Sequence, residues 1–279
     1  MKVSLITVCR NCAVMLRTAL ESVERQRGAD IEYIVVDGGS TDGTGKLLRS
    51  FESRFRDAGI AFRWMSESDR GMYDAINKGV AMASGDIVGI LNADDVLASD
   101  DVLADVAGAF GDTVDALYAD IRFVRDERPG ETSLDEMRSL PTARYYSARR
   151  WRPWMLQWGF MPPHPSFYAR RSLFDTLGGY KLGYLIAADY ELLIRFLRKA
   201  GLRTRYLPEC LVTMRLGGRS TRGWRSTLTL NCENVRANRE NGYFCCLAMM
   251  LPKYLFKVWE LRPAFVARSH GACKPGANG

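Results

Sequence analysis

The sequence lacks any uninterrupted apolar run of the roughly 18 residues that a membrane-spanning helix requires, so we expect no transmembrane segment. A secretory signal peptide is missing too, because the short apolar run near the N-terminus leads straight into polar residues instead of a cleavage site. Both absences favour a cytoplasmic protein.

Metal-site patterns of cysteine are also missing. Among the seven cysteines, Cys9 and Cys12 form a C-x-x-C, but no second pair follows at the spacing of a zinc site. Cys9 closes an apolar run, and Cys245 and Cys246 are adjacent within an apolar segment. We therefore expect reduced and mostly buried thiols, not a zinc site or a disulfide framework.

Two common phosphate-binding fingerprints are absent as well. No G-x-G-x-x-G follows the first apolar stretch, which counts against a Rossmann dinucleotide site, and no G-x-x-x-x-G-K-[ST] occurs, which counts against a P-loop. A diphosphate bound by this chain would need a metal to neutralise it.

The composition is that of an ordinary globular protein: of the 279 residues, 47% are hydrophobic and 25% are charged. The formal charge of +7 is uneven, because basic residues concentrate after Arg138. This asymmetry suits a phosphate-bearing substrate or an anionic membrane surface. We expect no nucleic-acid partner, because no recognised binding module accompanies the charge.

The first hundred residues alternate between strand-like and helix-like patterns. The predicted strands are 3–8, 31–36, 62–66 and 87–91. A helix is predicted after each of the first three strands, with the second at 44–55 and the third at 73–83. We expect Asn11 to cap the first helix and Ser40, Thr41 or Asp42 to cap the second. This order predicts an α/β fold, with a mostly parallel sheet flanked by helices and polar strand ends along one edge.

The second half is less regular. We expect helices at 102–110, 172–177 and 188–200, a strand at 116–124, an exposed loop or hairpin at 125–138, and edge strands at 203–206 and 211–216. The segment 243–262 is apolar with interspersed basic and aromatic residues, so it is either a membrane-interfacial helix or a helix packed on the core.

Carboxylates follow two of the predicted strands. Asp37 ends the second strand, where it could accept hydrogen bonds from a base or ribose, or could simply begin a turn. The buried strand 87–91 ends in Asn92, Ala93, Asp94 and Asp95. Paired carboxylates at such an edge suit a Mg²⁺ or Mn²⁺ ion that holds a diphosphate, although a plain turn has the same composition.

A third acidic position, Asp189, is predicted at the start of the helix 188–200. The helix N-terminus would favour its ionised form, as a general base requires. An ordinary N-cap is the alternative.

The chain resembles the family 2 glycosyltransferases in five motifs that occur in the same order. These motifs are V-S-L-I-T-V-C-R-N, V-V-D-G-G-S-T-D-G-T, S-D-R-G-M-Y-D-A-I-N-K-G, A-S-G-D-I-V-G-I-L-N-A-D-D and A-A-D-Y-E-L. The chain is similar to bacterial members that assemble exopolysaccharide, colanic-acid-type polymers or O-antigen. The resemblance implies a GT-A fold, a UDP-, GDP- or dTDP-sugar donor, a divalent metal (Mn²⁺ or Mg²⁺) and inversion at the anomeric carbon.

The resemblance also assigns roles to residues. It implies that Asp37 contacts the nucleobase with Thr7 nearby, and that Arg70 and Lys78 help to hold the nucleotide. Within a glycosyltransferase domain at 1–225, we expect residues 1–100 to form a nucleotide-binding half and 101–225 an acceptor-binding half. From the sequence pattern we also expect a helical segment at 226–265, either membrane-interfacial or packed on the core, and a disordered tail at 266–279.

The D-x-D signature of the family corresponds to Asn92-Ala93-Asp94, which makes Asp94 a metal ligand with Asp95 beside it. Asn92 departs from the commoner Asp. Asp189 matches the catalytic base, although Ala188 stands where a Glu is frequent, and Arg219 lies in a loop suited to closing over the diphosphate.

His164 and Trp158 are candidates for contact with the acceptor, a glycan or lipid-linked saccharide, and His164 could equally be structural. Two other functions remain open on the residues alone. One is a sugar-phosphate nucleotidyltransferase, which would need a Gly-rich basic loop where Cys9, Arg10 and Asn11 stand. The other is a non-catalytic nucleotide-sugar-binding protein.

Overall fold

The structure is a computed structural model that describes residues 1–217 and 223–254. Arg219, the predicted tail 266–279 and the second part of the segment 243–262 lie outside these residues. Every helix within the described ranges is too short or too polar to cross a lipid bilayer.

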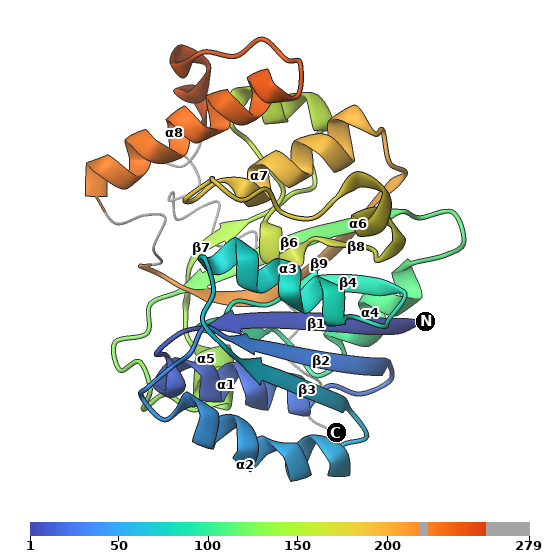
Figure 1. The fold of residues 1–279 in the computed structure, drawn as a ribbon, viewed down its shortest axis with the longest axis vertical. Coiled ribbons are helices and arrows are strands. Elements are labelled where there is room, and N and C mark those ends of the chain that lie inside the picture. The colour runs from blue at the N-terminus through green and yellow to red at the C-terminus, as the bar shows by residue number, and fades with distance from the viewer. Residues whose placement is uncertain (218–222, 255–279) are drawn as a thin grey trace.

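The N-terminal half follows the predicted alternation (Figure 1). Its elements are β1 (Lys2–Cys9), α1 (Ala13–Glu24), β2 (Asp30–Asp37), α2 (Thr44–Asp57), β3 (Ala61–Ser66), α3 (Met72–Met82) and β4 (Ile87–Ile90). The strands β3, β2, β1 and β4 pair in parallel in that order. Their carboxyl ends therefore lie at one edge of the sheet.

The second half continues the same sheet. Its strands are β5 (Val96–Leu97), β6 (Ala116–Val124), β7 (Thr142–Tyr146), β8 (Tyr168–Arg170) and β9 (Thr204–Arg215). Its α-helices are α4 (Val102–Ala109), α5 (Leu134–Ser139), α6 (Ser172–Leu177), α7 (Ala188–Leu193) and α8 (Gly223–Glu240). Short 3-10 segments occupy Pro153–Trp158, His164–Ser166 and Leu247–Met250.

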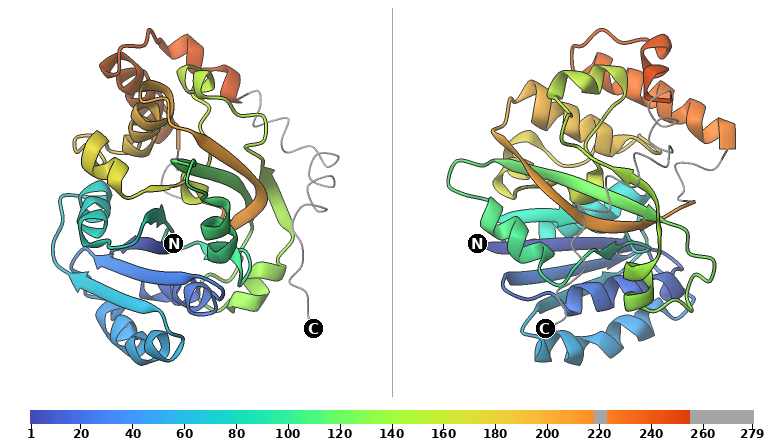
Figure 2. Two further views of the ribbon diagram at one scale, coloured as in Figure 1. Left: turned by 90° about the vertical axis from the view of Figure 1, so that its right-hand side faces the viewer. Right: turned by 180° about the vertical axis from the view of Figure 1, so that it is seen from behind.

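The sheet order is β3-β2-β1-β4-β8-β6-β9-β5, with β7 paired to β6. Strand β8 runs antiparallel to both of its neighbours, so the parallel part and the second half join through it. Helices α1 and α2 cover one face, and α3 and α7 lie on the opposite side with α8 beyond them (Figures 1 and 2). The predicted α/β architecture is confirmed.

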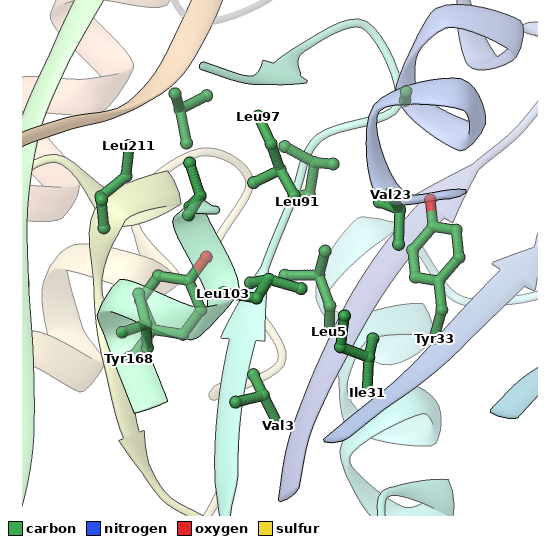
Figure 3. Close-up of a cluster of buried hydrophobic side chains, with 14 of the residues drawn as sticks. Val3, Leu5, Val23, Ile31, Tyr33, Leu91, Leu97, Leu103, Tyr168 and Leu211 are labelled. Carbon is green, nitrogen blue, oxygen red and sulfur yellow. The ribbon is translucent and has the colours of Figure 1, made fainter. Parts of the chain in front are cut away.

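The two largest hydrophobic clusters lie on opposite faces of the sheet. The larger cluster joins Leu5 and Ile31 of the parallel strands to Leu97, Leu103 and Leu211 of the second half (Figure 3). Because one continuous cluster spans both halves, the edge that carries the strand ends has a single rigid support.

Three predicted elements differ from the structure. The segment 125–138 contains α5, which begins with a capping box in which Ser133 and Glu136 exchange hydrogen bonds. The two predicted edge strands form the single strand β9, which lies inside the sheet between β6 and β5. The two-residue strand β5 that covers it is too short to give a sequence pattern.

Helix starts differ as well. Asn11 does not cap α1; its backbone has a φ of 50° and its side-chain oxygen accepts a hydrogen bond from the Thr41 N–H. For α2, the predicted caps Ser40, Thr41 and Asp42 are wrong, because the N-cap is Gly43 and no side chain caps the helix. The Asp42 carboxylate lies one residue earlier and accepts from the Thr44 N–H. The helix predicted at 188–200 begins as α7 and continues with π-helical spacing at Ile194–Lys199.

The segment after α8 packs partly on the core. Cys245 and Met250 are buried against Val235 of α8, whereas Phe244 and Leu251 are 74% and 62% exposed. The described part of the segment 243–262 therefore has a packed side and an exposed apolar side.

Candidate active site

The loops that follow β1, β2 and β4 meet at one edge of the sheet. Cys9 pairs in register with Asp37, and the Leu91 N–H donates to the Ile6 carbonyl just past the end of β4. This edge is where parallel α/β sheets bind their ligands. The predicted strand-end residues are therefore brought together.

Asp37 is buried at the end of β2 and is fully engaged by the protein. Its carboxylate accepts hydrogen bonds from the Ser40 N–H at 3.0 Å and from the Ser66 hydroxyl at 2.6 Å, and the Ser40 hydroxyl donates to it as well. The Cys9 thiol lies 3.7 Å from its Oδ1. Asp37 thus holds the ends of β1, β2 and β3 in one arrangement.

The glycine-rich loop after β2 is tied to the loop after β1. Asp42 accepts hydrogen bonds from the Ala13 N–H at 3.0 Å and from Thr44, which links the starts of α1 and α2. A Cβ at Gly38 would lie 2.3 Å from Oδ2 of Asp69, so a larger residue here would displace the Asp69 side chain of the loop after β3.

Thr7 lies in the core beneath this edge. Its side chain is fully buried, where its hydroxyl donates to the Leu91 carbonyl at 2.9 Å and accepts from the Tyr33 hydroxyl at 2.9 Å. The geometry therefore gives Thr7 a role in joining β1, β2 and β4, with no surface presented to a ligand.

The turn after β4 separates the roles of its two carboxylates. Asp95 is buried, and its oxygens accept from the Asn92 side-chain amide at 2.8 Å and from the Arg215 N–H at 3.3 Å. Asp94 is partly exposed, and within residues 1–217 and 223–254 no hydrogen bond to its carboxylate is found. Asp94 is thus the carboxylate that this turn leaves available.

Arg215, at the end of β9, binds the buried side of this turn. It is not among the residues predicted from the sequence. Its guanidinium donates to the Asp94 carbonyl, to Asp126 at 2.8 Å and to Thr18 at 3.2 Å. The only signal in the sequence is a basic residue at the end of a mostly apolar stretch, two positions before Gly217. Arg215 fixes the backbone of Asp94 and so aims its side chain.

Arg70 lies in the loop between β3 and α3, and Lys78 lies in the second turn of α3 with its ammonium group against that loop. Arg70 bonds Asp74 at 3.0 Å, yet its side chain is 76% exposed. Lys78 pairs with Glu67 at 2.6 Å and donates to the Ser68 carbonyl at 3.1 Å. Both cations contact the loop after β3. The Arg70 side chain is exposed, so its ion pair is weak enough to be exchanged for a ligand phosphate, whereas the Lys78 side chain is only 25% exposed.

Asp189 lies in the first turn of α7, and Tyr73 of α3 reaches it. The Tyr73 hydroxyl is 3.4 Å from Oδ1 of Asp189 and donates to the Ile186 carbonyl. Tyr73 is not among the residues predicted from the sequence, although it lies between Arg70 and Lys78 in the third of the five motifs. Helix α3 thereby connects the loop after β3 to Asp189.

Burial raises the pKa of Asp189, and the combined opposing effects of His164, the Tyr190 N–H and Tyr73 do not cancel it. The helix N-terminus favours the ionised form, as predicted, through backbone N–H groups that lower the pKa, but the net shift of the pKa is upward. Desolvation of the carboxylate outweighs the favourable dipole. A raised pKa brings a carboxylate closer to the range in which a general base works.

His164 belongs to the same cluster. Its Nε2 shares a 2.7 Å hydrogen bond with the Tyr180 hydroxyl, and Tyr180 stacks on Tyr73 with 5.9 Å between ring centroids. Burial lowers the pKa of His164, and the charge of Asp189 opposes this shift. Trp158 ends the 3-10 segment Pro153–Trp158 and is 39% exposed.

The described residues contain no group of three or more His, Cys, Asp or Glu side chains that could hold a metal alone. Mg²⁺ and Mn²⁺ do not require one, because they bind one or two carboxylates together with substrate phosphates. The available carboxylate of Asp94 fits that donor set.

Solved structures share this fold. The chain aligns with Staphylococcus aureus TarS 1–349 at a TM-score of 0.59 and 17% identity, covering 85% of this chain and 65% of that structure. It aligns with the Pyrobaculum calidifontis mannosyltransferase PcManGT, solved with GDP-Man and Mn²⁺, at a TM-score of 0.59 and 21% identity over 99% of this chain and 75% of that one. The fold is therefore that of the GT-A glycosyltransferases.

The sequence comparisons give the family. The model described as Glycosyl transferase family 2 matches residues 4–177. A PGL/p-HBAD biosynthesis glycosyltransferase from Mycobacterium bovis is 33% identical over 73% of each chain. An uncharacterized glycosyltransferase from Mycobacterium tuberculosis is 36% identical over 69% of this chain and 68% of its own length. The chain belongs to glycosyltransferase family 2, as the five motifs indicated.

Proposed function

We propose that this chain transfers a hexosyl group from a nucleoside-diphosphate sugar to a hydroxyl of a glycan or lipid-linked saccharide, with inversion at the anomeric carbon. The observation that carries the proposal is the position of α3. Its first turn reaches the carboxylate of Asp189, while Arg70, just before it, lies in the loop at the strand-end edge. A donor bound at that edge would lie beside the base.

The donor would bind across the ends of the parallel strands in residues 1–100. Arg70 and Lys78 offer positive charge, and the loop held by Asp37 borders the place proposed for the base. TarS has been solved with UDP-GlcNAc and PcManGT with GDP-Man and Mn²⁺, which supports a UDP- or GDP-sugar here.

Asp94 would hold a Mn²⁺ or Mg²⁺ ion, which when bound offsets the charge that develops on the departing diphosphate. Asp95 and Arg215 then act on the metal site only by fixing the turn. Arg219, outside the described residues, is proposed to reach the same diphosphate. Asn92 adds no charge, and its amide holds Asp95.

Asp189 would take the proton of the acceptor hydroxyl as that oxygen attacks the anomeric carbon in line. One displacement inverts the centre and leaves the nucleoside diphosphate, so no covalent enzyme intermediate is required. The second half, 101–225, would position the acceptor. His164 lies in the buried cluster of Asp189 and Tyr180, and Trp158, six positions earlier in the chain, is exposed.

Synthesis of a cell-surface polysaccharide is the proposed setting, with the enzyme in the cytoplasm at the inner face of the membrane. The exposed apolar side chains Phe244, Leu247 and Leu251 support a peripheral contact with lipid. The name of the M. bovis relative also places that protein in the biosynthesis of PGL.

The test is a screen of UDP-, GDP- and dTDP-sugars with the purified chain, with Mn²⁺ or EDTA, that measures release of nucleoside diphosphate. We expect turnover of at least one donor, and its loss by about 100-fold or more in Asp189→Asn. Asp175→Asn, an exposed carboxylate on α6, is the matched control and should retain full turnover. No turnover of any donor, or unchanged turnover in Asp189→Asn, contradicts the proposal.

A further inference from the structure

Helix α8 lies against α7, although the family match ends before either helix (Figure 1). Its buried face is rich in polar residues, because Glu233, Asn234 and Asn238 are all buried, as is Asn241, which directly follows the helix. Burying polar side chains is costly unless each one is paired, so these contacts define what this face does.

Glu233 accepts three consecutive backbone hydrogen bonds from the segment that leads into α7. Its Oε1 lies 2.7 Å from the Leu185 nitrogen, and its Oε2 lies 2.9 Å from the nitrogens of Ile186 and Ala187. Ala187 is the N-cap residue of α7 and stands two positions before Asp189. One carboxylate therefore fixes the backbone that enters the helix.

The same face of α8, together with Asn241 just after it, also donates hydrogen bonds to the residues that follow Asp189. The Asn238 side-chain amide donates to the Tyr190 hydroxyl at 3.0 Å, and the Asn241 amide donates to the Glu191 carboxylate at 3.1 Å. Contacts from α8 and the residue that follows it thus reach the chain both before and after Asp189.

We propose that Glu233 is a positioning residue for Asp189, through which α8 sets the place of the base relative to the donor site. The proposal rests on the proposed function of Asp189. From the opposite side, Tyr73 of α3 donates to the Ile186 carbonyl. The peptide groups around Ile186 are therefore held by α8 through their N–H groups and by α3 through a carbonyl.

The charge of Glu233 matters to this arrangement. A carboxylate has only acceptors, so it can face three N–H donors at once, and it also complements the positive end of the helix that follows. An amide in its place would turn an NH₂ group toward at least one N–H. The substitution Glu233→Gln keeps the size of the side chain and removes that match.

The first readout is backbone amide exchange in residues 185–187, which needs no ligand. We expect exchange there to be about tenfold faster or more in Glu233→Gln. The second readout is steady-state kinetics with whichever donor of the UDP-, GDP- and dTDP-sugar panel turns over fastest in Mn²⁺. We expect kcat to fall about tenfold or more while the donor KM stays within about twofold, because a misplaced base slows the reaction without touching the donor.

Glu240→Gln is the matched control, since it makes the same change on the same helix. Glu240 bonds the side chains of Lys181, Tyr184 and Arg236, and no backbone N–H of 185–187. It should change thermal stability without the selective fall in kcat. If Glu233→Gln does not fold, Glu233→Asp, which keeps the charge but is shorter, takes its place with the same two readouts.

A folded Glu233→Gln variant with wild-type kcat, or with equal losses in kcat and donor affinity, overturns the proposal. Asp189→Asn in the same assay separates the two claims. If Asp189→Asn is inactive and Glu233→Gln is normal, only the positioning role fails; if Asp189→Asn is fully active, the proposed function fails first.

Discussion

The Nε atom of Arg215 lies 2.8 Å from Oδ2 of Asp126, with only 5% and 2% of the two side chains exposed. The same guanidinium donates to the Asp94 carbonyl and to the Thr18 hydroxyl. This buried pair therefore joins the loop after β6, helix α1 and the turn that carries the proposed metal ligand.

Removing the charge of Asp126 should unfold the protein more easily. Asp126→Asn leaves the buried guanidinium of Arg215 without its counter-charge, which typically costs about 3 kcal/mol. Urea unfolding at neutral pH measures the loss. Asp101→Asn is the control, because the Arg27–Asp101 pair is mostly exposed and should cost no more than about 0.5 kcal/mol. Equal losses in the two variants would show that burial of the Arg215 pair adds nothing.

The pH dependence of that difference has a definite sign. Burial opposes the ionised form of Asp126, but hydrogen bonds from Arg215 and Thr132 outweigh it and lower the pKa of this carboxyl. A group with a lowered pKa in the folded state stabilises the protein above its unfolded pKa, and this contribution disappears as the pH falls through the folded pKa. The gap between the wild type and Asp126→Asn should therefore shrink on acidification.

Much of the edge formed by the ends of the parallel strands was predictable from the sequence, because it depends on local patterns. Strands buried on both faces and glycine-rich turns are encoded within a few residues, so Asp37 and Asp94 were placed at strand ends correctly. The five motifs then gave the family, which the comparison confirmed.

The remaining features depend on contacts between distant parts of the chain. Thr7 looks like a strand-end polar residue, yet the hydroxyl of Tyr33 and the carbonyl of Leu91 enclose it. The roles of Arg215 and Glu233 rest on partners about 120 and 46 positions away, which no periodicity reveals. The sign of the pKa shift of Asp189 likewise follows from tertiary burial.

Tyr73→Phe should move the acidic limb of the kcat profile to higher pH. If Asp189 is the base, activity appears as the pH rises through its pKa. Burial raises that pKa, while His164, the Tyr190 N–H and the Tyr73 hydroxyl lower it. Without the hydroxyl the pKa rises further, so a smaller fraction of Asp189 is ionised at mildly acidic pH.

The measurement is kcat as a function of pH with saturating donor. Tyr33→Phe is the matched control, since its hydroxyl is bonded to Thr7 and not to Asp189. It should leave the position of the limb unchanged. A shift of the limb to lower pH in Tyr73→Phe would rule out the proposed contact between this hydroxyl and the base.

Tyr168→Phe should stabilise the protein. Tyr168 of β8 is fully buried beside Gly89 of β4, and its hydroxyl has no hydrogen-bond partner among the described residues. A buried hydroxyl without a partner costs about 1 kcal/mol or more, which the phenyl ring avoids at the same shape. Thermal unfolding should show a higher midpoint, and a lower one would mean that the hydroxyl is satisfied.

Asp94 and Asp95 should respond differently when each is replaced by Asn. Asp94 has an available carboxylate, whereas Asp95 is bonded to Asn92 and to the backbone of Arg215. Asp94→Asn should therefore keep the thermal stability of the wild type but lose the increase in UDP affinity that Mn²⁺ produces. Asp95→Asn should do the reverse, with lower stability and a retained response to Mn²⁺. Titration of UDP by calorimetry, with Mn²⁺ and with EDTA, gives both affinities for each variant. If Asp94→Asn still binds UDP more tightly in Mn²⁺, the ion is held elsewhere and the turn after β4 is not the metal site.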